Sequence, residues 1–251
     1  MSNTLVLRQD DGPIARLTLN DPARANVLSS AMIEALGAAI EAAVADPSAR
    51  VVELAAAGKI FCAGHELGEL RAGDDKNVHQ ALFARCSELM LAIGASPKPV
   101  IAKVQGAAVA AGCQLVASCD LAYAAEGARF AVSGIDLGLF CSTPSVALTR
   151  AVRPKAALEM LLTGRFVGAA EAETIGLINR AVPASDLDRV VDEAAHAIAG
   201  KPAEAVALGK ALFRRQIEMP LAEAYAVAGE RMAENLTFTA TKAGIDRFLA
   251  K

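Results

Sequence analysis

The sequence lacks the features of several common classes of protein. Its five cysteines are odd in number and form no Cys-x-x-Cys pair, which argues against a disulfide framework and a structural zinc site. The formal net charge is only −3, and Lys and Arg are scattered, so no basic patch marks a nucleic acid or an anionic membrane as a partner. We therefore expect a soluble protein of the reducing cytoplasm.

Segments for targeting or membrane insertion are also missing. Residues 1–11 contain neither a charged segment followed by an apolar one nor an Arg-rich amphipathic presequence, so we predict no cleaved leader. The most apolar stretch, residues 100–125, is interrupted by polar residues such as Lys103, Gln114 and Asp120 and is too mixed to span a membrane. We interpret it as a buried strand, a turn and a helix.

Hydrophobic residues, in contrast, make up 54% of the 251 residues, which is enough for one sizeable core. Short β-branched and Leu-rich runs predict strands at residues 5–8, 14–19, 51–55, 100–104 and 121–124. Helical spacing lies between them, at residues 33–44, with Ser30 as the cap and Asp46-Pro47 as the stop, and at residues 78–93. This alternation predicts a parallel α/β core.

The second half of the chain is richer in helical patterns. They cover residues 155–162, 169–175, 186–198, 203–217 and 221–235, with one short strand at 178–182. We expect residues 1–195 to form the core with the site, and residues 196–251 to form a helical region for packing and oligomerisation.

Two turns of small residues are candidates for the site. The first, Phe61-Cys62-Ala63-Gly64-His65-Glu66-Leu67, follows the predicted strand at 51–55 and so lies at the carboxyl edge of the sheet, where ligands bind. The second runs from Val104 to Leu115 and leads into a helix near Ala111, whose first N–H groups have no helical partner. Two such N–H groups that converge on a thioester carbonyl form an oxyanion hole. The alternative is a close strand–helix contact that tolerates Ala and Gly; the two turns together favour the oxyanion hole.

These residues resemble the enoyl-CoA hydratase/isomerase (crotonase) family. Residues 61–67 are similar to its F-x-A-G-x-D-L turn, and residues 106–120 to its G-x-A-x-G-G-G-x-x-L-x-x-x-C-D signature. Residues 110–120 and 138–144 resemble in particular the hydratase-domain-containing subgroup found in mitochondria. The resemblance implies an α/β crotonase-like fold, with repeated ββα units, parallel sheets and a helical C-terminal trimerisation region. It also implies an acyl-CoA substrate, coenzyme A only as part of that substrate, no permanently bound cofactor, and a homotrimer or a hexamer built as a dimer of trimers.

By the same resemblance, the oxyanion donors are the backbone N–H groups of His65 and Ala111. The segment 21–28 is similar to the R-P-x-x-x-N-A-L segment of the coenzyme A channel, which implies roles in coenzyme binding for Arg24 and Ala25. The turn at residues 61–67 implies the same role for Ala63 and Leu67. Arg24 either meets a phosphate or is a solvated loop arginine. The closing helix, residues 237–251, implies that Lys242 or Arg247 could also meet a phosphate, with a solvated helix face as the alternative.

The two glutamates used by hydratases of the family fall on Gln114 and Gly134. Neither residue can act as a general base, and each loss should cost about 100- to 10,000-fold in rate. Asp136 could turn into the pocket as a substitute base or could cap the turn before Gly138, and Glu66 more often braces its turn. Cys141 and Ser142 lie where the family places acyl-pocket groups, and inert packing is favoured for Cys141.

The side chain of His65 leaves further reactions open. Methylmalonyl-CoA decarboxylases of the family share Ala-Gly-His at this turn, and decarboxylation needs only enolate stabilisation. His79 and His196 lie in helical patterns, and no set of ligands suggests a metal. We therefore expect an acyl-CoA enzyme that is nominally an enoyl-CoA hydratase, a lyase. The alternatives are decarboxylation, thioester hydrolysis and non-catalytic acyl-CoA binding.

Overall fold

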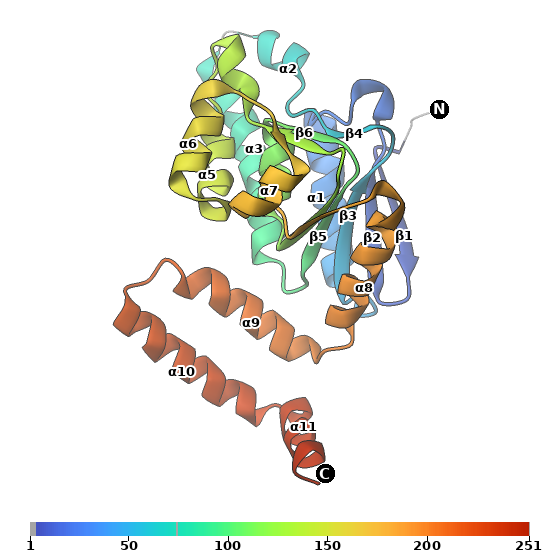
Figure 1. The fold of residues 1–251 in the computed structure, drawn as a ribbon, viewed down its shortest axis with the longest axis vertical. Coiled ribbons are helices and arrows are strands. Elements are labelled where there is room, and N and C mark those ends of the chain that lie inside the picture. The colour runs from blue at the N-terminus through green and yellow to red at the C-terminus, as the bar shows by residue number, and fades with distance from the viewer. Residues whose placement is uncertain (1–3, 74, 251) are drawn as a thin grey trace.

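The computed structural model describes residues 4–73 and 75–250, in which a six-stranded sheet forms the centre of the core (Figure 1). Its strand order is β1-β2-β3-β5-β7-β10, with β1 and β2 antiparallel and the other pairs parallel. The bounds are β1 Val6–Asp11, β2 Ile14–Leu19, β3 Val51–Ala56, β5 Val100–Val104, β7 Leu121–Ala125 and β10 Arg180–Val182. The predicted strands are thus confirmed to within three residues at each end.

A second sheet of four short strands has the order β4-β6-β8-β9. Its strands are β4 Ile60–Cys62, β6 Ala107–Val109, β8 Arg129–Ala131 and β9 Val167–Gly168. Three of them directly follow a strand of the first sheet and lead into helical structure, which gives the repeated ββα units that the resemblance implied. Periodicity cannot reveal strands of two or three residues, and these were not predicted.

Helices account for most of the remaining chain. In the core they are α1 Ser30–Ala45, α2 Leu67–Arg71, α3 Lys76–Ala95, α4 Ala111–Ser118, α5 Ser142–Ala151, α6 Pro154–Thr163, α7 Ala169–Ile175 and α8 Leu187–Ala199. Short 3-10 helices lie at η1 Pro22–Arg24, η2 Ser133–Leu137 and η3 Ala184–Asp186. One predicted cap was wrong: Ser29, not Ser30, caps α1, because its Oγ accepts from Met32 N at 3.2 Å.

Both faces of the central strands β2, β3 and β5 are largely buried, whereas the edge strand β1 is mostly exposed. Alternate strand residues point to opposite sides, so that Ala15 and Val52 join the main core while Ile14 and Val51 pack against α8. Helix α1 contributes buried residues to the first face, and α8 covers the second. Continuous hydrophobic strands therefore fit this sheet.

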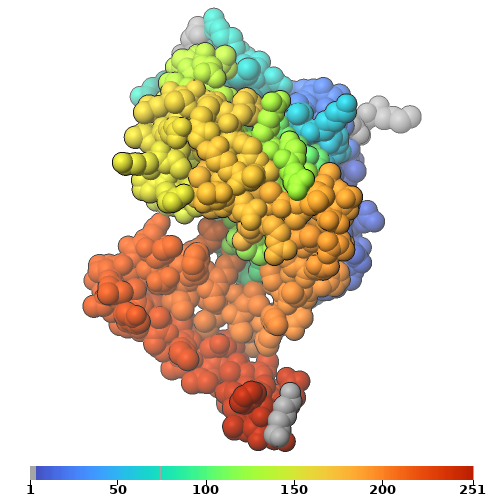
Figure 2. All heavy atoms as spheres, viewed as in Figure 1, coloured from blue at the N-terminus to red at the C-terminus, as the bar shows by residue number. Residues whose placement is uncertain are grey.

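The last helices, α9 Ala203–Gln216, α10 Leu221–Thr237 and α11 Thr239–Leu249, project from the core as a separate lobe (Figures 1 and 2). Asp120 holds α9 to the core, with Lys210 Nζ at 2.7 Å and Arg214 Nη2 at 3.0 Å from its carboxylate oxygens. Because α8 packs on the sheet, the boundary expected after residue 195 falls inside a core helix, and the projecting region begins after it.

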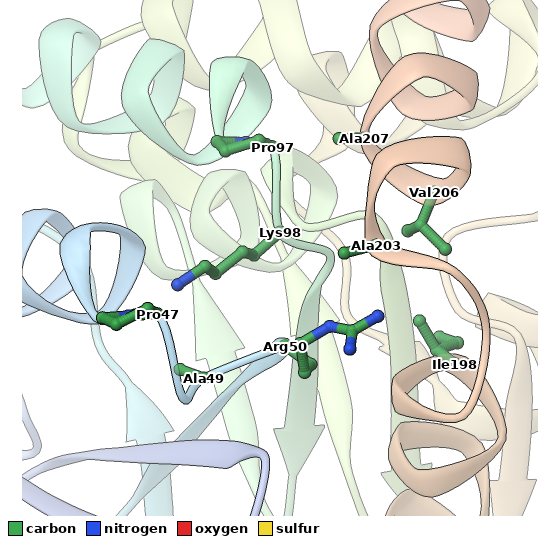
Figure 3. Close-up of a pocket in the computed structure, with 9 residues that line it drawn as sticks. All are labelled: Pro47, Ala49, Arg50, Pro97, Lys98, Ile198, Ala203, Val206 and Ala207. Carbon is green, nitrogen blue, oxygen red and sulfur yellow. The ribbon is translucent and has the colours of Figure 1, made fainter. Parts of the chain in front are cut away.

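A small cavity of about 160 Å³ lies where this lobe joins the core (Figure 3). Arg50 and Lys98 line it from the loops before β3 and β5; Arg50 points towards Ile198 and Val206, whereas Lys98 points towards Pro47 after the end of α1. The Arg50 guanidinium donates to Lys201 O at 2.5 Å. The cavity therefore lies at the amino-terminal edge of the sheet, at the junction between the core and α9.

A buried carboxylate ties together three strands of the large sheet. Glu53 is only 1% exposed, and Arg16 Nη1 and Lys103 Nζ each lie 2.6 Å from its oxygens. Both cations also reach α8, Lys103 through Asp188 at 2.9 Å and Arg16 through Asp192 at 2.8 Å. Burial alone would lower the pKa of Lys103, but its hydrogen bonds to Glu53 and Asp188 outweigh that effect and raise it.

We predict that Glu53→Gln destabilises the protein by about 3 kcal/mol, because it leaves two partly buried cations without their shared counter-charge. The free energy of unfolding in urea measures this. The control is Glu193→Gln, which breaks an exposed pair with Arg189 and should leave stability unchanged. Equal effects of the two substitutions would contradict the buried network.

Candidate active site

The two predicted turns are in direct contact. β4 and β6 pair in parallel, with Ile60 opposite Ala107. Gly64 has a φ of +92°, and a Cβ at this position would lie 2.9 Å from Val109 O and 3.3 Å from Ala111 N. A Cβ on Gly112 would lie 2.2 Å from Cys62 O. Only glycine allows this approach, which sets the turn after β4 against the first turn of α4.

Two backbone N–H groups at this contact have no acceptor within the described residues: those of His65 and Ala111. Among the neighbouring groups, Ala110 N donates to Ala131 O at 2.8 Å and Gln114 N to Ala110 O at 3.0 Å, whereas the N–H groups of Gly112 and Cys113 also have no backbone acceptor in the described residues. Ala111 is fully buried. The first turn of α4 therefore has free N–H groups that a ligand acceptor could use, as helix starts generally do, and the free N–H of His65 lies on the turn packed against it.

The chain turns sharply at Ala110, the residue before α4. The expectation concerned the backbone of Ala111, yet Ala111 is the first residue of the helix, and Ala110 before it has φ 50° and ψ −117°. L-residues with a Cβ rarely adopt this conformation, and such a residue stores about 1–3 kcal/mol of strain. The contacts of Gly64 and Gly112 hold Ala110 in place.

The loop from Asp21 to Leu28 lies beside the first turn. Ala63 N donates to Ala25 O at 3.1 Å, and Leu28 N to Gly64 O at 2.7 Å. Both Ala25 and Ala63 therefore lie next to the candidate donors; their role in coenzyme binding stays a prediction.

Asn26 organises this loop, a role that the sequence analysis missed. The side chain is fully buried, donates to Ala57 O at 2.9 Å and Ile60 O at 2.8 Å, and accepts from Asp21 N at 2.8 Å. It also adopts φ 51°, which Asn tolerates better than most residues. A lone Asn between Ala25 and Val27 was the available signal.

Arg24 forms an ion pair with Glu66, so it does not stand alone as a solvated loop residue. Glu66 also accepts from Gly68 N at 3.1 Å and caps α2, the bracing role expected for it. The hydrogen bond from Arg24 lowers the pKa of Glu66. Leu67, one residue further on, is 56% exposed.

The imidazole of His65 turns to helix α3. Its ring lies edge-on to Phe83, with the ring centroids 5.5 Å apart. Both ring nitrogens are buried and have no hydrogen-bond partner among the described residues. Burial lowers the pKa of His65, and the nearby Leu28 backbone and Glu69 offset only part of that effect. The side chain is therefore a neutral group near neutral pH.

Gln114 is the one polar side chain buried on α4 close to its first turn. It is 4% exposed, and its Oε1 is buried without a partner. The Cα–Cβ bonds of a helix tilt towards its N-terminus, so this amide leans towards Ala111. On its other side Gln114 lines a groove of about 1590 Å³ between the core and α9.

The position of Gly134 is filled by the chain itself. A Cβ there would lie 2.4 Å from Leu139 O and 2.8 Å from Cys141 Sγ. No side chain fits without moving the backbone. Burial raises the pKa of Cys141, so this thiol is a poor nucleophile, which agrees with inert packing.

Two other candidates lie in exposed positions. The Asp136 carboxylate faces Gly164 at the end of α6, where its Oδ2 would be 2.9 Å from a Cβ on that glycine. Lys242 is exposed on α11, which Figure 1 shows at the opposite end of the molecule from α2. Within a single chain the structure does not bring Lys242 to the two turns.

Metal ligands and membrane spans are absent from the described ranges 4–73 and 75–250. No three His, Cys, Asp or Glu side chains gather there as a metal site. None of the helices in those ranges is long and apolar enough to cross a bilayer.

Comparison with known proteins assigns the family. The model for enoyl-CoA hydratase/isomerase matches residues 9–251. The chain therefore belongs to the enoyl-CoA hydratase/isomerase family. A solved enoyl-CoA hydratase from Mycobacterium smegmatis has a TM-score of 0.96 at 52% identity, covering 99% of this chain and 97% of that one. The crotonase fold is thus confirmed.

The resemblance to the mitochondrial domain-containing subgroup is also confirmed. The rat protein named enoyl-CoA hydratase domain-containing protein 3, mitochondrial, is 43% identical over 244 residues, which are 97% of this chain and 81% of the relative. The solved human protein of the same name has a TM-score of 0.95 at 40% identity, covering 98% of this chain and 97% of that one.

We predict that Ala110→Gly stabilises the protein by about 1 kcal/mol. Release of the strain outweighs the extra freedom that glycine gives the unfolded chain. The melting temperature should rise by about 2–4 °C. An unchanged or lower melting temperature would show that Ala110 is not strained.

We also predict that Gly134→Ala destabilises the protein by about 1–3 kcal/mol, since even a methyl group meets the Leu139 carbonyl. Urea unfolding measures the cost. Gly127→Ala is the matched control, because a Cβ there meets nothing within 4 Å. If both alanine variants were equally stable, the space at Gly134 would not be filled as described.

Proposed function

We propose that this chain binds acyl-CoA thioesters and stabilises the oxygen of the thioester carbonyl with the N–H groups of His65 and Ala111. The observation that carries the proposal is the pair of unpaired donors on two turns held in contact by Gly64. The positive end of the α4 dipole adds to the field at Ala111, although α4 is short. Donors fixed in this way stabilise an enolate or a tetrahedral oxyanion without reorganising.

The nominal reaction is hydration of an enoyl-CoA, but it cannot use the two-glutamate mechanism here. Gln114 supplies a neutral amide, and the place of the second carboxylate is occupied by Leu139 and Cys141. The buried Oε1 of Gln114 could accept a hydrogen bond from a water or a substrate group, but it cannot act as a strong base. Hydration should therefore be slow.

Decarboxylation of a malonyl-type thioester is the second candidate. The observation that favours it is the lack of a carboxylate at Gln114 and Gly134 beside an intact pair of donors. Loss of CO₂ leaves an enolate, so the donors alone lower the barrier. Thioester hydrolysis and acyl-CoA binding without turnover are the remaining alternatives.

The coenzyme part of the ligand would lie along the surface that Ala25 and Ala63 form together, with Arg24 and Leu67 at its side. Lys242 could reach a phosphate only from a neighbouring subunit. A trimer or a pair of trimers is supported by the apolar side chains exposed on α9 to α11, among them Phe213, Tyr225 and Phe248. A cytoplasmic location stays a prediction, and the similar rat protein is named mitochondrial.

The test removes one donor and follows three substrates. Ala111→Pro deletes the N–H at the first position of α4, where helices accept proline, and Ala111→Gly keeps it. Crotonyl-CoA hydration, CO₂ release from malonyl-CoA and butyryl-CoA hydrolysis are each measured. We expect turnover of at least one substrate in the wild type and the glycine variant, and a loss of about 100- to 1,000-fold with proline.

A variant is used only if its melting temperature is close to that of the wild type, which shows that it folds. If Ala111→Pro does not fold, His65→Pro replaces it. Full turnover by a folded proline variant would overturn the role of the donors. If the wild type binds acyl-CoA tightly but turns over none of the substrates, its function is acyl-CoA binding without catalysis.

A further inference from the structure

The ion pair of Arg24 and Glu66 joins the loop before α1 to the first turn of the candidate site. Arg24 ends η1 in the loop that precedes α1, and Glu66 immediately follows the donor residue His65. Between them, the loop and the turn are linked by the backbone bonds Ala63 N to Ala25 O and Leu28 N to Gly64 O. The pair therefore lies on the outer side of this bonded loop and turn, one residue from a candidate donor.

This pair is arranged so that it can exchange partners. The Arg24 side chain is 51% exposed and that of Glu66 is 25% exposed, so a ligand can reach the guanidinium from solvent. Asp21 Oδ2 lies 3.6 Å from Arg24 Nη1, which is a weaker contact. Exposed ion pairs contribute little free energy, so a phosphate can displace the Glu66 carboxylate from Arg24 at a small cost in free energy.

Glu66 has a second partner that remains when the pair opens. Its Oε1 accepts from Gly68 N at 3.1 Å, whereas its Oε2 faces Arg24. The cap on α2 therefore keeps the carboxylate in place while the guanidinium turns away. Arginine can then bind a phosphate through two parallel N–H groups.

We propose that Glu66 is an affinity-determining residue that competes with a phosphate group of the bound thioester for Arg24. This inference rests on the proposed function and adds a regulatory contact to it. In the free protein Glu66 holds Arg24, and phosphate binding would separate the two side chains. Glu66 thus lowers the affinity for phosphorylated ligands and does not affect ligands without phosphate.

The test compares two ligands that differ in their phosphates, butyryl-CoA and S-butyryl-pantetheine, by titration calorimetry. Glu66→Gln keeps the amide oxygen that can cap α2 but weakens the hold on Arg24. We expect it to bind butyryl-CoA about two- to five-fold more tightly and the pantetheine thioester unchanged. Arg24→Met should weaken butyryl-CoA binding about ten-fold and also leave the pantetheine thioester unchanged.

The double variant Arg24→Met/Glu66→Gln separates competition from net charge. It should bind butyryl-CoA like Arg24→Met alone, because without Arg24 there is nothing to compete for. Glu193→Gln changes the net charge equally at the exposed pair on α8, and we expect no change in affinity.

Three outcomes would overturn the inference. Weaker butyryl-CoA binding in both single variants would make the pair a structural brace, and a gain from Glu66→Gln that persists without Arg24 would be a charge effect. In either case the proposed function stands. If the wild type binds neither thioester, the proposed function fails and the competition at Arg24 fails with it.

Discussion

The contact between Gly64 and the first turn of α4 is the constraint on which the candidate site depends. It requires a left-handed glycine on one turn, a second glycine that admits the Cys62 carbonyl on the other, and parallel pairing of β4 with β6. Each of these serves the close approach of two backbones. The result is that two N–H groups far apart in the sequence become neighbours without any side-chain chemistry.

The rest of the core supports this contact from two sides. Asn26 fixes the loop beside the first turn with three hydrogen bonds, and the large sheet holds β3 and β5, from which β4 and β6 continue. The buried Glu53 joins these central strands to α8. These buried polar interactions of Asn26 and Glu53 therefore hold the backbone in position and do not present reactive groups.

The site combines well-placed donors with a lack of bases. The buried amide of Gln114 carries no charge, and at Gly134 the Leu139 carbonyl and the Cys141 thiol leave no space for a side chain. A pocket of this kind can polarise a carbonyl, but it has no strong base beside the donors at α4.

Sequence alone determined much of the architecture. Apolar runs at residues 14–19 and 100–104 matched β2 and β5, and small residues around Ala111 indicated a helix that begins there, because periodicity and turn chemistry are local properties. The motifs at residues 61–67 and 106–120 also predicted the family, which the comparisons confirm, whereas the donors and the missing glutamates that the resemblance implied stay predictions.

Tertiary structure alone decided how those residues meet. Only the pairing of β4 with β6 sets Gly64 against Ala111, and only the folded loop pairs Arg24 with Glu66. Ala110 has the strained backbone, and the space beside Gly134 is filled by Leu139 and Cys141. Both follow from contacts in the folded chain, which no local sequence pattern records. Side chains such as Asp136 and Lys242 could be named from the sequence, but their distance from the donors depends on packing.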